Sequence, residues 1–576
     1  MTRRIGRSIG TAGSKRMRRH LAAGLLAGAV AIVNSNVSAA STPSLYGAYI
    51  GAGYAEEISD FETAANLLER LLEVEPNDPL LQRRGLLANL NAGRMERAVD
   101  LARDQVAVYP PETDIATLTL VADTVRKEDW EGVLNLVNSS RPTLLARFAV
   151  PVISAWSLMA LGDTAAAIEA LEPLREENEL PEFPNYHAGL IFLHAGQPEE
   201  AEAVLAQYAD AIPDSGVGTL RVLVRAYDAQ GRTEDAHAIL EELAVLHPGL
   251  LVVERDLAAL DAGETLPPMV DGPAAGISDA MTDLALRIRR QAPATALRYA
   301  RLGVHMDAGN DLGRMIAASV LESVDRFDEA IDELAQVDPA SVYDWDARIA
   351  IGENLIRLSR DDEAVEHLEA LAEENPDDVE ALRQLGYLMR LRHRFEEGYD
   401  YYDRALDRVD GNSPDDWALY YSRGITLERT GRWEEAERDL KKALELNPGD
   451  PLVLNYLGYS WIDQGVNIDE AMEMIREAVE QQRNNGFIVD SLGWAHYRVG
   501  QFEEAVLQLE RAVQLEPGNA IVNDHLGDAY WRVGRRFEAR YQWERALSQD
   551  PDDDLRETIE RKLEEGLDAV EGDSDG

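Results

Sequence analysis

The amino-acid sequence predicts an all-α fold, a right-handed superhelical solenoid built from helix–turn–helix repeats. The first observation is a glycine that recurs at steps of 34, 35 and 34 residues, at Gly424, Gly458, Gly493 and Gly527. The second is an alanine that recurs in the same frame, at Ala436, Ala471, Ala505 and Ala539. Self-similarity at a fixed period of this length is typical of repeat proteins in which each unit is a pair of helices.

The unit around Gly493 shows why these residue types recur. Gly493 and Ala505 are small, and we expect them where the two helices of the unit approach closely; Ala512 is expected where the second helix meets the next unit. Gly500 opens the turn between the helices, and Pro517 ends the second helix because proline cannot continue the hydrogen-bond ladder. One hairpin cannot bury both of its faces, so the units must stack and share a core.

The same frame extends along most of the chain and predicts two arrays, a partly degenerate one at 45–261 and a second one at 280–554. Clear units occupy 79–110, 182–213, 217–248, 345–376, 379–413 and 417–450, and three more follow Pro448. Weaker units occupy roughly 45–76, 113–146, 148–181, 276–310 and 311–343. Together they make about 14 units.

Three segments fall outside the repeat pattern. Residues 262–279 are rich in proline and glycine, which predicts a linker between the two arrays, either a plain loop or a joint. Residues 555–570 form an amphipathic pattern that predicts a capping helix over the last repeat. The acidic tail 571–576 is polar and is expected to be disordered.

The first 39 residues have the layout of a secretory signal peptide. Seven basic residues and no acidic residue precede the apolar run Leu21–Val33, and Val37-Ser38-Ala39 supplies the small residues that favour cleavage after Ala39. The apolar run is shorter than the roughly 20 residues that span a bilayer as a helix. We therefore expect secretion to the periplasm, with an uncleaved membrane anchor as the alternative.

Composition excludes several classes of function. The chain has 576 residues with 105 Asp and Glu against 56 Lys and Arg, a formal net charge of -49, which becomes -49 - 7 = -56 if residues 1–39 are removed. Sequence-independent binding of nucleic acid or of an anionic membrane needs clustered basic residues, so neither is expected. The chain has no cysteine, which excludes disulfides, thiolate zinc sites, cysteine nucleophiles and a lipid anchor on an N-terminal cysteine.

No catalytic pattern is found in the sequence. A phosphate-binding glycine loop, a G-x-S-x-G nucleophile motif and an H-E-x-x-H zinc motif are all missing. His187 and His194 lie seven residues apart on one predicted helix, but both occupy ordinary repeat positions. We therefore predict a protein that is not an enzyme and that holds neither a cofactor nor a metal.

The positions Leu492-Gly493, Gly500, Phe502, Ala505, Ala512 and Pro517 resemble the tetratricopeptide repeat (TPR) pattern. The resemblance implies a scaffold for protein–protein interaction in which the first helix of each hairpin lines the inner surface. Carried onto this chain, it implies a binding groove lined by Tyr421, Ile425, Asn455, Tyr459, Asp490, Trp494, Tyr497, Asp524, Asp528 and Trp531. Such aromatic side chains suit a peptide or protein partner, although Trp494 is equally compatible with packing between helices.

The charge of this predicted groove bears on the kind of partner. TPR domains that hold a peptide's terminal carboxylate place Lys, Arg and Asn at the inner positions, whereas this chain places Asp490, Asp524 and Asp528 there. We therefore disfavour capture of a terminal carboxylate and expect a basic or apolar segment of a partner.

A narrower resemblance covers roughly residues 415–550. The blocks NYLGYSWIDQG (455–465), IVDSLGWAHYRVG (488–500) and NDHLGDAYWRVG (523–534) are similar to the C-terminal part of large TPR proteins of the Gram-negative envelope. Members of that group are lipoproteins that bring substrates, such as cell-wall hydrolases, to a periplasmic carboxyl-terminal processing protease. The resemblance implies an adaptor of this kind, but the chain lacks the cysteine that those lipoproteins need for their anchor.

Two alternatives to the adaptor remain open. One is a scaffold for envelope assembly, such as polysaccharide export or pilus biogenesis. The more distant one is an enzyme whose site is hidden in a degenerate segment, around 113–146 or 250–310. The sequence does not determine the oligomeric state.

Overall fold

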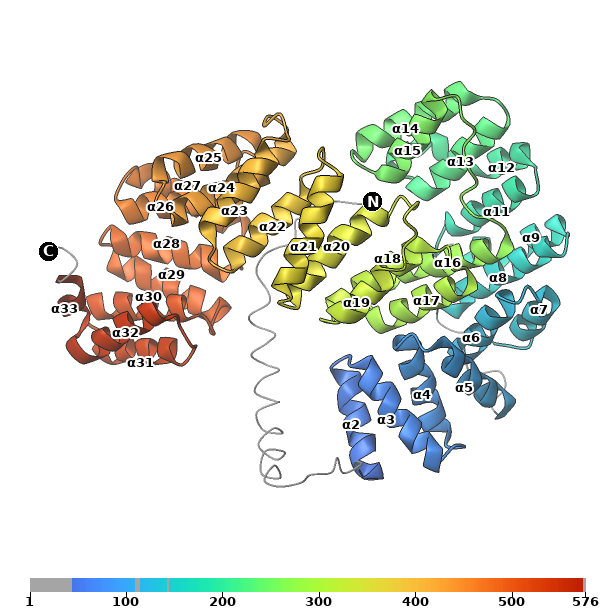
Figure 1. Ribbon diagram of the computed structural model, residues 1–576, viewed down its shortest axis with the longest axis horizontal. Coiled ribbons are helices and arrows are strands. Elements are labelled where there is room, and N and C mark those ends of the chain that lie inside the picture. Colours follow the sequence, from blue (N-terminus) through green and yellow to red (C-terminus); the bar gives the residue numbers. More distant parts are fainter. Residues whose placement is uncertain (1–43, 109–113, 142–144, 178, 573–576) are drawn as a thin grey trace. The chain divides into compact units, whose positions relative to one another are not determined.

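The computed structural model describes residues 44–108, 114–141, 145–177 and 179–572 (Figure 1). The predicted signal peptide therefore lies outside the described residues. Within them the chain forms only helices, turns and loops, which confirms the all-α prediction. The chain divides into two compact units, unit 1 ending at Ala364 and unit 2 beginning at Val365, and the division falls within helix α21.

Unit 1 contains two kinds of element, paired helices and a few single ones. Its elements are α2 (Leu45–Glu57), α3 (Phe61–Val74), α4 (Pro79–Asn91), α5 (Met95–Val108), α6 (Asp114–Val125), α7 (Trp130–Asn138), α8 (Ala146–Ala160), α9 (Thr164–Glu169), α10 (Glu172–Glu177), α11 (Phe183–His194), α12 (Pro198–Leu205), η1 (Ala206–Asp214), α13 (Val217–Ala229), α14 (Thr233–Leu246), α15 (Leu251–Asp261), α16 (Pro273–Ile288), α17 (Pro293–Met306), α18 (Asp311–Ser323), α19 (Phe327–Leu334), α20 (Asp344–Arg357) and α21 (Asp361–Glu374). Each repeat predicted from the 34-residue frame contains two helices, and α10 and α15 are additional to these pairs.

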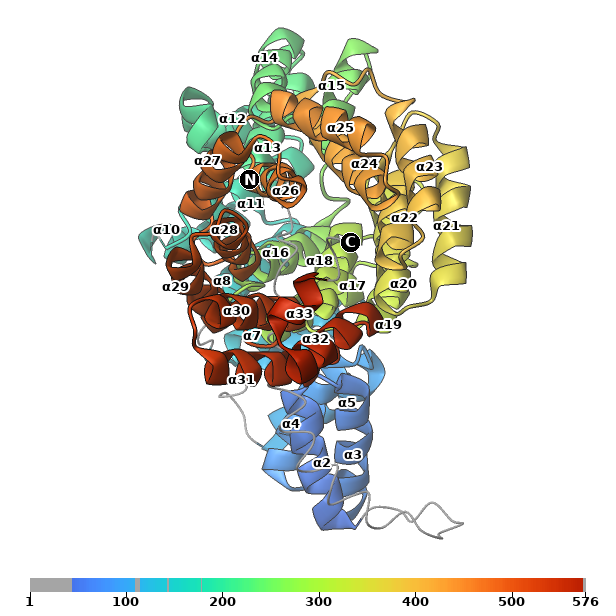
Figure 2. The same cartoon turned by 90° about the vertical axis from the view of Figure 1, so that its left-hand side faces the viewer.

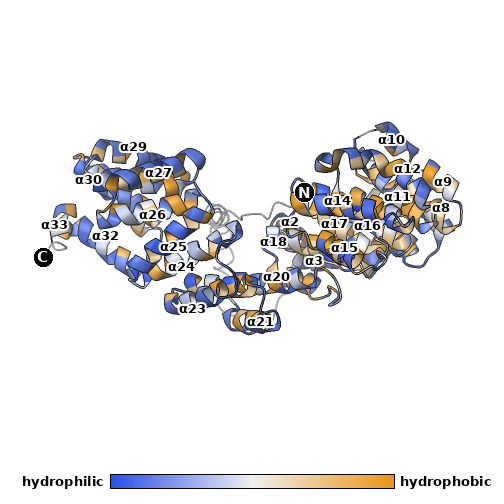
Figure 3. Ribbon diagram, turned by 90° about the horizontal axis from the view of Figure 1, so that it is seen from above, coloured by the Kyte–Doolittle hydropathy of each residue, from blue (hydrophilic) through white to orange (hydrophobic). Residues whose placement is uncertain are grey.

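Unit 2 continues with more regular hairpins and ends with two further helices. Its elements are α22 (Glu380–Leu391), α23 (Phe395–Leu406), η2 (Pro414–Asp416), α24 (Trp417–Arg429), α25 (Trp433–Leu446), α26 (Pro451–Gln464), α27 (Ile468–Gln481), α28 (Gly486–Arg498), α29 (Phe502–Leu515), α30 (Ala520–Arg532), α31 (Arg536–Leu547), α32 (Asp553–Glu565) and α33 (Leu567–Gly572). Hydrophilic and hydrophobic residues alternate along the helices, as expected where each helix buries one face (Figure 3).

The recurring glycines lie where the two helices of a hairpin are in contact. A Cβ atom on Gly493 would lie 2.5 Å from Leu509 Cγ, and one on Gly458 would lie 2.9 Å from Ile475 Cγ1. These positions therefore cannot accept a larger residue without moving the second helix. Gly500 has a φ of 81°, a left-handed conformation that favours glycine and turns the chain between α28 and α29.

Capping residues set the helix starts within the repeats. Before α26, the Asp450 Oδ1 atom accepts hydrogen bonds from the amides of Leu452 (2.9 Å) and Val453 (3.2 Å). Pro451 occupies the first turn, where its missing amide proton costs nothing. A turn that begins with a proline and ends with an aspartate or asparagine thus stops one repeat and starts the next.

The proline- and glycine-rich segment differs from the predicted linker. Residues 262–272 are non-helical, but α16 begins at Pro273, so the last residues of the predicted 262–279 linker are helical. The segment is fixed to α13: the Leu266 amide donates to Asp228 Oδ2 (2.9 Å), and Arg225 Nε donates to the carbonyl of Pro267 (2.7 Å). Both predicted arrays contribute to unit 1, and the compact units separate about one hundred residues later.

Helices α16 and α17 pack against α4, α6 and α8, the first helices of hairpins far earlier in the chain. Gly276 in α16 makes this approach possible, because a Cβ atom there would lie 2.1 Å from the buried ring of Trp156 in α8. Arg301 in α17 donates to the carbonyl of Asn91, and Arg326 Nε donates to the carbonyl of Ser59 (2.7 Å). Within unit 1, α16 and α17 therefore cover α4, α6 and α8.

The C-terminal cap is two helices rather than the single one predicted over 555–570. Gly566, with a φ of 87°, separates α32 from α33. Ile559 of α32 and Leu567 of α33 are fully or almost fully buried in the apolar cluster of unit 2. Helix α33 also extends to Gly572, into the predicted acidic tail, whose last four residues lie outside the described residues.

Candidate functional site

The first helices of successive hairpins in unit 2 form its inner side. Figure 2 shows α24, α26, α28 and α30 on the inside of the arc of unit 2 and α25, α27, α29 and α31 on the outside. Helix α26 also contacts α28, and α28 contacts α30. We use the name inner surface for the side chains that these four inner helices direct away from their outer partners.

All ten predicted groove residues lie on these inner helices, but none is strongly exposed. Five are buried: Ile425, Asp490, Tyr497, Asp524 and Asp528. The other five are partly buried: Tyr421, Asn455, Tyr459, Trp494 and Trp531. The residues thus share one side of unit 2, while their accessibility is lower than an open groove would give.

The three aspartates of the predicted groove face other residues of the chain. Lys562 Nζ of α32 lies 2.8 Å from Asp524 Oδ2 and 2.8 Å from Asp528 Oδ2, and all three side chains are buried. Farther along, His525 Nδ1 lies 3.0 Å from Asp490 Oδ2. The expectation that these carboxylates repel or attract a partner directly therefore has to be corrected, because they neutralise a lysine and a histidine of the same unit.

Burial and proximity shift the pKa values of this ion cluster. Burial, together with the nearby Asp524 charge, raises the pKa of Asp528 to about 6. For His525, burial opposes the charged form, but Asp490 outweighs burial and raises its pKa. Burial likewise disfavours the Lys562 ammonium, yet Asp528 and Asp524 outweigh it and raise its pKa. The cluster couples α28, α30 and α32 through charges held away from water.

Trp531, at the C-terminal end of the inner surface, is held by the cap. Its Nε1 donates to Asp568 Oδ2 of α33 (3.0 Å), and the Arg536 guanidinium lies 3.7 Å from its ring centroid. The indole also touches Gly566, where a Cβ atom would lie 2.7 Å from it. This residue therefore fixes α33 rather than offering a free ring.

Trp494 combines packing with an unused polar atom. Its ring stacks on Tyr497, with centroids 4.7 Å apart, and on His525, with centroids 4.1 Å apart. Its Nε1 is buried and has no hydrogen-bond partner among the described residues. The ring of Trp494 thus packs between helices, and its buried N–H is left without a partner among the described residues.

A second unused polar atom lies on the neighbouring inner helix. Asn455 Oδ1 of α26 is also buried without a partner in the part of the chain that the structure describes. Nearby, Tyr421 meets Tyr456 edge to face at 6.0 Å, and the Tyr456 hydroxyl donates to Glu428 Oε2 (2.9 Å). Burial, with Asp490 nearby, raises the pKa of Tyr459, so its hydroxyl stays neutral. The five partly buried residues of the predicted groove are thus uncharged, and four of them are aromatic.

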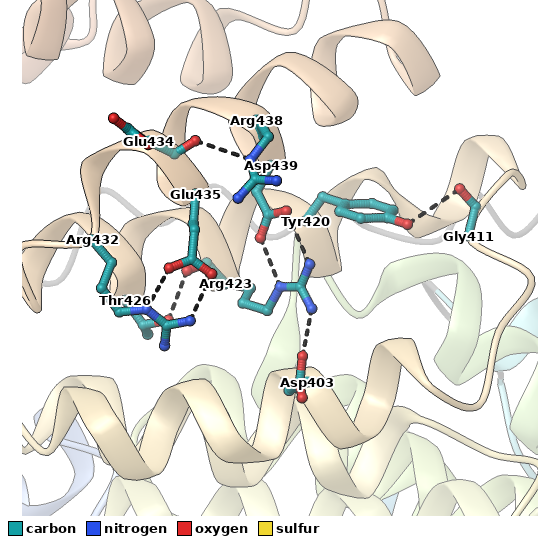
Figure 4. Close-up of polar contacts among 10 residues, drawn as sticks. All are labelled: Asp403, Gly411, Tyr420, Arg423, Thr426, Arg432, Glu434, Glu435, Arg438 and Asp439. Carbon is teal, nitrogen blue, oxygen red and sulfur yellow. Dashed lines mark hydrogen bonds and ion pairs between the residues drawn. The ribbon is translucent and has the colours of Figure 1, made fainter.

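An ion pair network keeps the preceding helices in register (Figure 4). Arg423 of α24 lies between Asp439 of α25, with Nε 2.7 Å from Oδ2, and Asp403 of α23, with Nη1 2.6 Å from Oδ1. The Tyr420 hydroxyl donates to the carbonyl of Gly411 at 3.5 Å. The sequence does not predict this network, nor the roles of Lys562, His525 and Tyr456, because the residues that pair are 16 to 38 positions apart.

The described residues offer no group of three or more His, Cys, Asp or Glu side chains placed to hold a metal ion. Among the same residues, the helices are either too short or too polar to cross a bilayer.

An apolar cavity of about 360 Å³ lies at the start of unit 1, lined by Leu45, Tyr49, Leu71, Val74, Leu80 and Leu81 together with Glu75 and Asp78.

The tetratricopeptide repeat family matches residues 154–216 and 377–448. Both segments are similar to tetratricopeptide repeats. Tetratricopeptide repeats of other proteins act in protein–protein interaction and bind protein or peptide partners. A further family, described as the bacterial transcriptional activator domain, matches residues 417–563.

The similar proteins align with this chain over very different lengths. The TPR repeat-containing protein PA4667 of Pseudomonas aeruginosa is 28% identical over 183 residues, which are 30% of this chain and 29% of that relative. Among solved structures, the APC/C hetero-tetramer Cut9–Hcn1 aligns with a TM-score of 0.40 and 14% identity over 90% of this chain and 96% of that one. A TPR protein from Parabacteroides merdae aligns with a TM-score of 0.36 and 16% identity over 44% and 97%.

Proposed function

We propose that this protein is a non-catalytic adaptor of the bacterial periplasm, which binds a protein partner and brings substrates to a carboxyl-terminal processing protease. The interaction role is supported by one observation above all: Asn455 Oδ1 and Trp494 Nε1 are unused hydrogen-bonding atoms on neighbouring inner helices, amid partly buried aromatic rings. The protease is suggested by the blocks at 455–465, 488–500 and 523–534, and the periplasm by the layout of residues 1–39.

The surroundings of these two atoms indicate how a partner is recognised. Asp490, Asp524 and Asp528 are already matched by His525 and Lys562, so little uncompensated charge remains there. Both atoms are buried, so a partner segment has to displace the neighbouring rings before it donates to Asn455 Oδ1 and accepts from Trp494 Nε1, which satisfies both polar atoms. Recognition of this kind depends on apolar contact and hydrogen bonds, and we expect it to weaken only slightly with salt.

Affinity capture from envelope extracts tests the proposal. We expect the purified protein to recover a carboxyl-terminal processing protease together with cell-wall hydrolases. Asn455→Leu should reduce recovery by about tenfold, since the partner's donor then loses its acceptor, and Trp494→Phe should reduce it because the N–H is lost. Phe537→Ala is the matched control, because Phe537 is 90% exposed on the outer helix α31.

Circular dichroism distinguishes a binding defect from unfolding in these variants. A variant that keeps the wild-type helical signal but loses the protease supports the proposal. Recovery of neither a protease nor a cell-wall enzyme by the folded wild-type protein would refute the adaptor role. Equal recovery by all three variants would show that the partner binds elsewhere.

The match of residues 417–563 to the bacterial transcriptional activator domain favours one other candidate, the interaction domain of a transcriptional regulator. Such a protein acts in the cytoplasm, whereas the adaptor is exported. Fractionation of producing cells therefore separates the two: recovery in the cytoplasm favours the regulator, and recovery in the periplasm favours the adaptor. The formal charge of -49 already argues against direct contact of this chain with nucleic acid.

A further inference from the structure

Helix α2, at the start of unit 1, exposes an apolar face. Tyr46 is 76% exposed, Ile50 51% and Tyr54 50%. The three residues are spaced by four, so they lie along one stripe of the helix. Ala48, Ala52 and Ala55 occupy the opposite side and are buried in the core. Large apolar side chains along an exposed stripe are unusual for a terminal repeat, which normally presents a polar face.

Comparison of α2 with the equivalent helix α4 of the next repeat shows which packing contact is missing at this stripe. Tyr54 corresponds, 34 residues later, to Ala88 in α4, which is only 4% exposed because α3 of the preceding hairpin packs against α4. At that same contact, a Cβ atom on Gly85 would lie 2.9 Å from Leu72 of α3. Among the described residues, α2 has no such preceding hairpin. Leu80, which corresponds to Tyr46, stays 55% exposed, so the end of the stripe at Tyr54 is the position at which another helix would continue the stack.

We propose that a second copy of this chain covers the stripe, through an antiparallel α2–α2 contact about a two-fold axis at Ile50. The sequence of α2 is nearly palindromic about this residue, reading Tyr-Gly-Ala-Tyr-Ile-Gly-Ala-Gly-Tyr from 46 to 54. Across the axis, Ile50 meets its own copy, Tyr46 meets Tyr54, and Gly47 meets Gly53. A two-fold contact needs a self-complementary surface, and this arrangement supplies one, with glycines beside the tyrosine rings.

Charge supports the antiparallel direction. No charged residue lies between Leu45 and Ala55, whereas Glu56 and Glu57 end the helix. In the antiparallel pair, these carboxylates lie beside the N-terminus of the other α2, where the helix dipole favours negative charge. In a parallel pair, the carboxylates of the two copies would meet each other. Since each copy carries a formal charge of -49, the dimer is expected to strengthen as salt screens the wider repulsion.

Sedimentation of the purified full chain measures this association. One helix face of 13 residues is smaller than the roughly 800 Å² per partner of a standard interface, so we expect a dissociation constant in the micromolar range. Ile50→Glu places two like charges on the axis and should raise that constant by at least about 100-fold. Phe537→Glu, on a more exposed apolar residue of unit 2, should leave it unchanged.

Charge exchange tests the pairing of Tyr46 with Tyr54. The double variant Tyr46→Lys, Tyr54→Lys should be monomeric, and so should Tyr46→Glu, Tyr54→Glu, because like charges meet at both contacts. Mixed in equal amounts, the two variants should form a heterodimer, since each lysine then faces a glutamate. Two monomers that stay apart on mixing would overturn the antiparallel register.

The absence of cysteine from the chain allows a direct geometric test. Ile50→Cys places one thiol on the axis, and an added mild oxidant should join the two copies at high yield. Leu507→Cys, at a residue that is 65% exposed in unit 2, should not join them. A wild-type protein that is monomeric at 100 µM, a dimer that survives Ile50→Glu, or a monomer that instead floats with phosphatidylcholine vesicles would overturn the proposal. Circular dichroism checks that each variant is folded.

Discussion

At the scale of single residues, the buried ion cluster of Lys562, Asp524 and Asp528 determines how the last hairpin holds its cap. Its three charges come from α30 and α32 and are withdrawn from water. A buried ion pair adds little net stability when complete, but removal of one partner typically costs about 3–5 kcal/mol. The last hairpin therefore needs the cap in place, because without Lys562 its two buried carboxylates would lose their partner.

The titration of this cluster predicts a pH dependence with a definite sign. Asp528 has a folded pKa of about 6 against an ordinary value of 3.8, so the folded state holds this proton more tightly. The resulting stability is complete below about pH 4 and is lost as pH rises through 6. The pKa of His525 is also raised, so its contribution is complete below 6.5 and is lost at higher pH. Both effects have the same sign.

We therefore expect hydrogen exchange of the α30 amides to be slower at about pH 5 than at about pH 8, after correction for intrinsic rates. The difference should be on the order of 2 kcal/mol in opening free energy. Asp528→Asn should reduce the change in opening free energy between pH 5 and pH 8. Asp469→Asn, at an exposed residue of α27, should leave that change as it is. Stability that increases from pH 5 to pH 8 would contradict this assignment.

At the scale of elements, the contact of α16 with α8 depends on a single glycine. Gly276→Ala adds a Cβ atom that would lie 2.1 Å from the Trp156 ring, and Trp156 is fully buried. We expect a loss of about 1–3 kcal/mol in the free energy of unfolding, since the ring or the helix must move. Chemical denaturation with a fluorescence readout measures it.

Gly218→Ala is the control for that substitution. Its Cβ atom would meet only Tyr186, at 3.4 Å, which is ordinary contact. Alanine also favours the helix by up to about 1 kcal/mol, so this variant should be neutral or stabilising. Equal unfolding curves for the two variants would show that the stability of the protein does not depend on the close contact of α16 with Trp156.

The hairpins could be predicted from sequence because they obey a local rule. Gly424, Gly458 and Gly493 recur with the period of the fold, and each lies where its own hairpin closes. The contact of α16 and α17 with α4, α6 and α8 could not be predicted, because no periodic signal links residues some 200 positions apart. Asp524 and Asp528 were placed on the correct helix, but their partner Lys562 lies outside the repeat frame.

At the scale of the whole molecule, the proposed export would change the net charge of the chain. The seven basic residues within positions 1–39 are the densest positive stretch, and removing them leaves a formal charge of -49 - 7 = -56. We expect the intact mass of protein recovered from producing cells to correspond to a chain that starts at Ala40. Ala39→Lys should block cleavage and leave the longer mass. A wild-type protein that starts at Met1 or Thr2 would contradict export by cleavage.

The two ends of the repeat stack differ in a way that limits assembly. Helices α32 and α33 seal one end, with Ile559 and Leu567 buried and Lys562 inserted between two carboxylates. Among the described residues, α2 leaves a continuation site, and the proposed two-fold contact uses that site on both copies at once. Growth therefore stops at two chains, whereas a stack with two open ends could add copies head to tail into a filament.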